Sequence, residues 1–289
     1  MSSRPSARCG WPWPKRAVAR ESRSISDGPN RDRRPSGLHK EPAAVTVRIL
    51  KDEKAVARAV AARVIATLAA TPAAVLGLPT GRTPVQLYAR LRAAHAAGRV
   101  DFAQATTFNL DEFLGLPADH PASYRAFMET HLFGHVNLSR HRIHFLNGAA
   151  PDPVAECARY EAAIRRAGGI DLQILGIGAN GHIGFNEPAA GLIGDSHLAR
   201  LAPGTRRSNS DLFGGRVRAV PPNALSMGVG TILRSRAVVL VATGAGKADA
   251  IAATVEGLVT TRVPASLLQL HEAVEVVVDQ AAAAGLTRR

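Results

Sequence analysis

An alternation of short apolar runs and amphipathic segments constrains the fold more than any other feature of the sequence. It begins after Pro42 and continues to residue 279. Strands are expected near residues 45–50, 73–78, 105–110, 143–146, 170–177, 237–243 and 274–279, and helices from residue 52 and near 84–97, 121–132, 153–167 and 246–257. Buried strands separated by helices favour a mostly parallel sheet with helices on both faces. We therefore predict an α/β fold, with one Rossmann-like domain over residues 43–289.

The composition favours a compact chain outside the membrane. Hydrophobic residues make up 46% of the 289 residues, which is enough for a sizeable core. No apolar run approaches the roughly 18 residues that a membrane span needs. The two cysteines, Cys9 and Cys157, stand far apart. A disulfide or a thiolate metal cluster is not expected, and a reducing cytoplasm is the predicted setting.

The net charge of +13 is concentrated near the N-terminus. Residues 1–40 contain ten Lys or Arg and three Asp or Glu, whereas the other 249 residues contain 26 and 20. The Arg-, Ser- and Pro-rich composition predicts that residues 1–42 are a basic disordered extension. An arm that binds nucleic acid or a membrane surface is the alternative. Because more than half of the excess charge lies in this extension, we expect no nucleic-acid or membrane partner.

Ligands of such folds bind beyond the carboxyl ends of the strands, which directs attention to three strand-to-loop junctions. In the first, residues 78–84, a loop with Gly81 leads into a helix start at Thr83-Pro84. Backbone N–H groups at a helix N-terminus, with the hydroxyls of Thr80 and Thr83, would form an anion site for a phosphate. The spacing does not fit a Walker A motif. The same pattern is also typical of an ordinary capped helix start.

The second junction, residues 108–116, places Asp111 and Glu112 directly after an apolar strand. A partly desolvated carboxylate at a strand end suits abstraction of a proton next to a carbonyl. The alternative is that Asp111 caps a turn and Glu112 is solvated.

The third junction, residues 176–188, is rich in glycine and contains His182, with Glu187 five residues later. A carboxylate that orients or charges an imidazole yields a tunable acid/base near neutral pH, whereas a solvated histidine is the alternative. The Gly-x-Gly-x-x-Gly spacing is a weak dinucleotide signal, because no acidic residue stands about twenty positions on. A zinc site needs three or four ligands. We expect no metal here or at the scattered His131, His135, His141 and His144.

Taken together, the segments LPTGRTP, FNLDEFLGL and GIGANGHIGFNEP resemble the glucosamine-6-phosphate deaminases. The resemblance covers about residues 45–280 and includes HPASYRAFM, the Asn209-Ser210 lid region, ALSMGVGTIL and SLLQLH. The 6-phosphogluconolactonases are similar in fold, but the stretch at residues 185–188 favours the deaminases. The resemblance implies a single domain with a lid segment that converts glucosamine 6-phosphate and water to fructose 6-phosphate and ammonia. It implies an amino-sugar phosphate as the small-molecule partner and no cofactor, and a homo-oligomer is compatible with it.

The resemblance also implies a role for each matching residue. Asp111 would take the C2 proton of the opened sugar and move it toward C1. His182 would help to open the pyranose ring by shuttling the O5 proton, assisted by Glu187 and Asn180. The residues implied to hold the substrate phosphate are Thr80, Gly81, Arg82, Thr83 and Lys247. For the lysine, a solvated side chain at a helix start is the alternative.

Two site positions depart from the family pattern. Asn180 stands where some members carry Asp, and an amide can orient the imidazole but cannot add negative charge. Asp211 stands where the family commonly has an arginine that meets the substrate phosphate from the lid. An acid there would repel phosphate. Arg206, Arg207 or Arg82 are the candidates to supply the missing positive charge.

A third departure concerns regulation. Allosterically activated members place basic residues between the glycine-rich turn and the lid, whereas Ala190–Ala199 contains only His197 as a potentially basic residue. We therefore expect no activation by N-acetylglucosamine 6-phosphate.

Two other functions stay open on the sequence alone. Asp211 leaves room for another sugar phosphate, such as galactosamine 6-phosphate or 6-phosphogluconolactone. A non-catalytic sugar-phosphate sensor is disfavoured, because the N-terminal extension has too few apolar residues for a DNA-binding helical unit.

Overall fold

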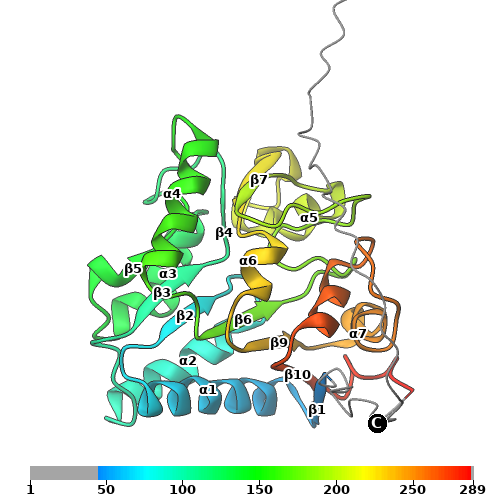
Figure 1. The fold of residues 1–289 in the computed structure, drawn as a ribbon, viewed down its shortest axis with the longest axis horizontal. Coiled ribbons are helices and arrows are strands. Elements are labelled where there is room, and N and C mark those ends of the chain that lie inside the picture. Colours follow the sequence, from blue (N-terminus) through cyan, green and yellow to red (C-terminus); the bar gives the residue numbers. More distant parts are fainter. Residues whose placement is uncertain (1–44, 288–289) are drawn as a thin grey trace, which may run out of the picture. The chain divides into compact units, whose positions relative to one another are not determined.

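A computed structural model describes residues 45–287, and the predicted basic extension lies outside this range. Within the described residues, seven parallel strands form the central sheet in the order β1-β10-β9-β6-β2-β3-β5. They are β1 (Thr46–Leu50), β2 (Val75–Leu78), β3 (Thr106–Asn109), β5 (Ile143–His144), β6 (Leu172–Gly176), β9 (Val238–Ala242) and β10 (Val274–Asp279). Each predicted strand is present, and the mostly parallel α/β sheet is confirmed (Figure 1).

Helices cover both faces of this sheet. One core contains side chains of α1 (Glu53–Ala70), α2 (Pro84–Ala96) and α3 (Tyr124–His131), and the other contains those of α4 (Pro153–Arg166), α6 (Val229–Leu233) and α7 (Ala248–Val255). In β9, Val239 and Val241 join the first core, whereas Val238, Leu240 and Ala242 join the second, as strand alternation requires. Burial on both faces explains why the strands read as continuous apolar runs.

A small antiparallel sheet was not predicted. It contains β4 (Asp111–Phe113), β8 (Asn223–Ser226) and β7 (His197–Arg200), in the order β4-β8-β7. The chain leaves the parallel sheet at Asn109 and enters the small sheet at Asp111, opposite Ser226. The predicted junction at Asp111 is therefore a passage between two sheets.

The remaining helical elements are short. They are α5 (Pro203–Ser208) and the 3-10 helices η1 (Phe133–His135), η2 (Arg140–Arg142), η3 (Ser210–Phe213), η4 (Val217–Ala219), η5 (Ala245–Lys247) and η6 (Pro264–Leu270). We call residues 203–219, from α5 to η4, the lid segment, because they contain the predicted lid region. Among residues 45–287, no helix combines the length and the apolar character that crossing a bilayer requires.

The strand order places a topological switch point between β2 and β6. From β2 the chain continues to β3 and β5 on one side, whereas from β6 it continues to β9 and β10 on the other. Folds of this type bind ligands in the crevice at such a point, beyond the carboxyl ends of the strands. The loops that border it, at residues 79–83 and 177–187, are two of the three predicted junctions.

Candidate active site

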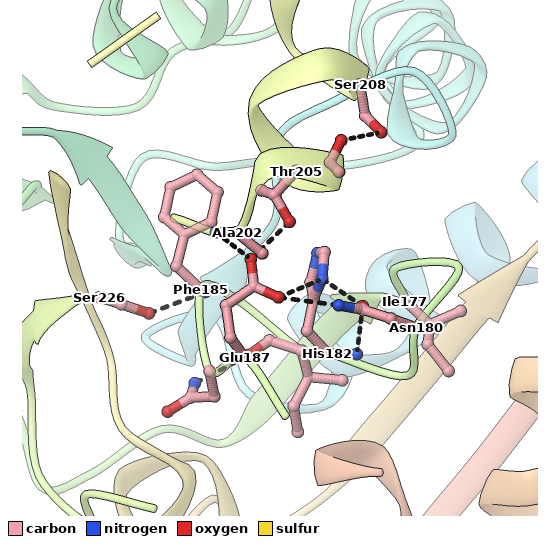
Figure 2. Close-up of polar contacts among 12 residues, drawn as sticks. Ile177, Asn180, His182, Phe185, Glu187, Ala202, Thr205, Ser208 and Ser226 are labelled. Carbon is pink, nitrogen blue, oxygen red and sulfur yellow. Dashed lines mark hydrogen bonds and ion pairs between the residues drawn. The ribbon is translucent and has the colours of Figure 1, made fainter. Parts of the chain in front are cut away.

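The turn after β6 brings Asn180, His182 and Glu187 into one hydrogen-bonded group (Figure 2). His182 Nδ1 lies 2.7 Å from Asn180 Oδ1 and 3.5 Å from Glu187 Oε2. The amide nitrogen of Asn180 donates to the same Glu187 oxygen at 2.8 Å. Because both partners of Nδ1 are acceptors, Nδ1 carries the proton and Nε2 is left to exchange one.

Glu187 is an anion in this group. Burial raises its pKa, but the hydrogen bond and charge of His182, with further hydrogen bonds from Thr205 and Asn180, outweigh burial and lower the pKa to about 2. The side chains of His182 and Glu187 are 19% and 13% exposed. The imidazole therefore has a fixed negative partner while it stays within reach of a ligand.

Two glycines shape the turn. Gly178 N donates to His182 O at 2.9 Å, and a Cβ on Gly178 would lie only 2.2 Å from Cε1 of the imidazole. Gly181 has a φ of 83°, and a Cβ there would lie 2.8 Å from Val263 Cγ1. The ring of His182 therefore lies directly against the backbone at Gly178, where a larger residue would displace it.

Asp111 faces this turn from β4. The residue is 7% exposed, and a Cβ on Gly184 would lie 3.8 Å from Asp111 Oδ2. Burial, and secondarily the charge of Glu112, raises the pKa of Asp111 to about 8. A carboxylate with such a pKa is a stronger base than an exposed aspartate, and it can both take and return a proton near neutral pH.

Glu112 has a structural role instead. It is buried, and its carboxylate accepts hydrogen bonds from the backbone N–H groups of Phe113, Tyr124 and Arg125 at 2.9, 3.0 and 3.1 Å. Burial raises its pKa to about 7, and these donors oppose the rise without cancelling it. The alternative of a solvated Glu112 is wrong, since the side chain ties the start of α3 to β4.

The predicted phosphate residues Thr80, Gly81, Arg82 and Thr83 form the loop between β2 and α2. Gly81 has a φ of 102°, and the Thr80 side chain lies near Tyr124, where it opposes the rise in the pKa of Tyr124 that burial causes. Thr83 stands at the N-cap position of α2 as predicted, but its backbone is helical and its side chain makes no capping hydrogen bond. Pro84 opens α2 as predicted.

Lys247 reaches the same edge of the sheet from η5, after β9. Its ammonium donates to the carbonyl of Ile177 at 2.7 Å, and burial lowers its pKa. The alternative of a solvated lysine is wrong. The side chain is held at the start of the glycine-rich turn.

Asp211 of the lid segment forms an ion pair with Arg82 of the phosphate loop. The two side chains are 71% and 82% exposed. Arg206 is engaged elsewhere, since its guanidinium donates to the carbonyls of Val217 and Val220. Of the three candidate arginines, Arg82 is the one that lies beside the unusual acid.

Sequence reasoning missed Tyr124 and Thr205. Tyr124 donates to Asn209 Oδ1 at 3.1 Å, and the Thr205 hydroxyl donates to Glu187 Oε1. Tyr124 lies within the quoted HPASYRAFM segment, but no local pattern marks either side chain as part of a site. Their places follow from the tertiary fold alone.

The structure keeps the scattered histidines apart from this site. The ring of His144 stacks on Phe108, with centroids 4.5 Å apart, and His131 packs against Phe127. Over the described part of the chain, no group of three His, Cys, Asp or Glu side chains is placed to hold a metal ion.

Comparisons with known proteins point to one group of enzymes. Residues 51–185 match the family described as glucosamine-6-phosphate isomerases/6-phosphogluconolactonase. A glucosamine-6-phosphate deaminase from Shewanella loihica is 49% identical over 82% of this chain and 88% of its own length. One from Cellvibrio japonicus is 50% identical over 83% and 90%. Glucosamine-6-phosphate deaminase 2 from Bacillus subtilis is 52% identical over 73% and 85%.

Solved structures agree with this likeness. A monomeric glucosamine-6-phosphate deaminase superposes with a TM-score of 0.81 at 38% identity, covering 83% of this chain and all of the other. The 6-phosphogluconolactonase of Trypanosoma cruzi superposes with a TM-score of 0.70 over 86% of this chain, at 18% identity. At that identity the likeness concerns the fold alone.

Proposed function

This chain belongs to the glucosamine-6-phosphate isomerase/6-phosphogluconolactonase family, and within it we propose a glucosamine-6-phosphate deaminase that converts glucosamine 6-phosphate and water to fructose 6-phosphate and ammonia. The observation that carries the proposal is the buried carboxylate of Asp111 facing the turn that holds His182 and Glu187. A base with a raised pKa and a separate imidazole are the two groups that ring opening and a proton shift require.

Ring opening is assigned to His182. Its Nδ1 proton is held by Asn180 and Glu187, so Nε2 takes the proton of the anomeric hydroxyl and delivers one to the ring oxygen O5. The imidazole is positively charged between these two transfers. The Glu187 anion, 3.5 Å from Nδ1, stabilises that charge.

The proton shift is assigned to Asp111. Its carboxylate takes the proton from C2 of the open-chain aldehyde, whose amino group is in the ammonium form, and the ammonium passes a proton to O1, which leaves a neutral enol with the amino group on C2. Return of the proton to C1 gives a C2 iminium ion, to which water adds before ammonia leaves. Burial keeps the carboxylate basic enough for the first transfer and acidic enough for the second.

The phosphate end holds the sugar in register with these groups. Thr80, Gly81 and Thr83 offer hydroxyl and backbone donors from the loop before α2, and Arg82 and Lys247 offer positive charge. An anchored phosphate places C1, C2 and O5 repeatedly against the same catalytic groups, which lowers the entropic cost of reaction.

The direct test measures ammonia release from glucosamine, galactosamine and mannosamine 6-phosphates, beside hydrolysis of 6-phosphogluconolactone. We expect ammonia from glucosamine 6-phosphate and none from an Asp111→Asn variant that melts at a similar temperature. Absence of ammonia from all three amino sugars would refute the proposal. Lactone hydrolysis in its place would assign the protein to the other branch of the family.

We also propose that the reaction takes place in the cytoplasm, as a step in amino-sugar catabolism and N-acetylglucosamine utilisation. The small number of cysteines supports a reducing compartment. Sedimentation velocity would distinguish a monomer from the homo-oligomer that the sequence permits.

A further inference from the structure

We infer that Thr205 is a positioning residue, whose hydroxyl holds the carboxylate of Glu187 in line with His182. The inference rests on the proposed function. It goes further, because it assigns a part in the reaction to the lid segment, of which Thr205 is a member.

The two oxygens of Glu187 have separate partners (Figure 2). Oε2 accepts from Asn180 and faces His182, whereas Oε1 accepts from the hydroxyl of Thr205 and, at 3.2 Å, from the backbone N–H of Ala202. Thr205 is 4% exposed, so its hydroxyl is shielded from water. A buried hydroxyl that donates to a carboxylate is a strong constraint on the orientation of that carboxylate.

Thr205 is itself held in place through the lid segment. Its carbonyl accepts from Asn209 Nδ2 at 2.9 Å, and Asn209 Oδ1 accepts from the Tyr124 hydroxyl at 3.1 Å. Tyr124 also lies near Thr80 in the phosphate loop. A path of hydrogen bonds therefore connects Tyr124, which lies near the loop implied to hold the phosphate, with Glu187, and Thr205 is its last link.

Loss of the Thr205 hydroxyl should affect one step of the reaction. The backbone N–H of Ala202 is then the one donor left to Oε1. The carboxylate of Glu187 can rotate, and Oε2 leaves its place beside Nδ1 of His182. The charged imidazole loses stabilisation, which slows ring opening. Asp111 and the phosphate loop do not contact Thr205 directly, so substrate affinity should change little.

The test compares Thr205→Val, which keeps the shape without the hydroxyl, with Thr205→Ser, which keeps the hydroxyl. Ser208→Ala is the matched control, since the Ser208 hydroxyl lies on the same helix but donates to the carbonyl of Gly204. We expect Thr205→Val to lower kcat about tenfold with KM within about twofold. Thr205→Ser and Ser208→Ala should stay near wild type.

Several outcomes would overturn the inference. An unchanged kcat in Thr205→Val would do so, as would an equal loss in Thr205→Ser or a change confined to KM. Thr205→Ala serves in place of the valine variant if the latter does not fold, which thermal melting would reveal. A wild-type protein without deaminase activity would instead refute the proposed function, so the two failures are distinguishable.

The path through Tyr124 gives a second measurement. Tyr124→Phe removes the hydroxyl that donates to Asn209, and we expect a smaller loss of kcat than for Thr205→Val. If the path acts as a unit, the double variant loses less than the product of the two single losses. Independent, multiplicative losses would limit the inference to Thr205 and refute the connection to Tyr124.

Discussion

Replacing Asp211 by alanine should strengthen binding of the substrate phosphate. In the free protein the Asp211 carboxylate occupies Arg82, the one arginine of the phosphate loop. Because both side chains are largely exposed, the ion pair contributes only about 0.2–1 kcal/mol. Since 1.4 kcal/mol corresponds to a factor of ten, release of Arg82 should lower KM by about 1.5- to 5-fold. The change lies at the phosphate end of the crevice, so kcat should stay within about twofold.

The assay is steady-state ammonia release from glucosamine 6-phosphate by Asp211→Ala, Arg82→Ala and the double variant. Arg82→Ala should raise KM, and in its background removal of Asp211 should lower KM by less. The difference in KM between the wild type and Asp211→Ala should shrink in high salt, which screens exposed charges. Asp119→Ala, which removes an exposed acid from another loop, should have no effect. An unchanged or higher KM in Asp211→Ala would refute competition between the carboxylate and phosphate, and an unchanged KM in Arg82→Ala would exclude Arg82 as the compensating charge.

Three further outcomes follow from the structure. kcat/KM should rise with pH toward about 8, because burial and Glu112 raise the pKa of Asp111 to about 8 and only the deprotonated carboxylate accepts the C2 proton; a flat profile between about pH 6 and 9 would contradict this assignment. Gly178→Ala should displace the His182 ring and lower kcat about tenfold or more, whereas Gly176→Ala, whose Cβ would meet nothing within 4 Å, should keep activity; equal losses would show that the ring contact is not the cause. N-acetylglucosamine 6-phosphate should leave KM unchanged, because the stretch Ala190–Ala199 offers His197 as its only potentially basic residue; a clear shift in substrate affinity would contradict it.

The parallel sheet was predictable because its strands are buried on both faces. A run such as Val238–Ala242 needs no alternation with polar residues when each face packs against helices. The small antiparallel sheet left no such signal. β4 consists of Asp, Glu and Phe, and β7 contains both His197 and Arg200. Strands of three or four residues with polar side chains are set by their partners in space, which local sequence does not specify.

The three junctions were predictable for a topological reason. Parallel strands end at one edge of the sheet, so loops that follow β2, β3 and β6 converge whatever their separation in the sequence. The side chains that support the site were not predictable in this way. Thr205 reaches Glu187 from the lid segment, and Tyr124 joins α3 to Asn209 across 85 positions. These contacts depend on how the lid segment packs, for which the local pattern carries no information.

Asp111 and Glu112 are adjacent in the sequence, and only the structure distinguishes the surroundings of their two carboxylates. Successive residues of a strand point to opposite faces, so the two acids of β4 enter different surroundings. Glu112 meets three backbone donors, from Phe113 and from the start of α3, and they hold its pKa, which burial raises to about 7, below that of Asp111. For Asp111 no hydrogen-bond donor is found within residues 45–287, and burial acts on its charge without such compensation. Its basicity is therefore available for the substrate, because the strand directs the structural hydrogen bonds to its neighbour.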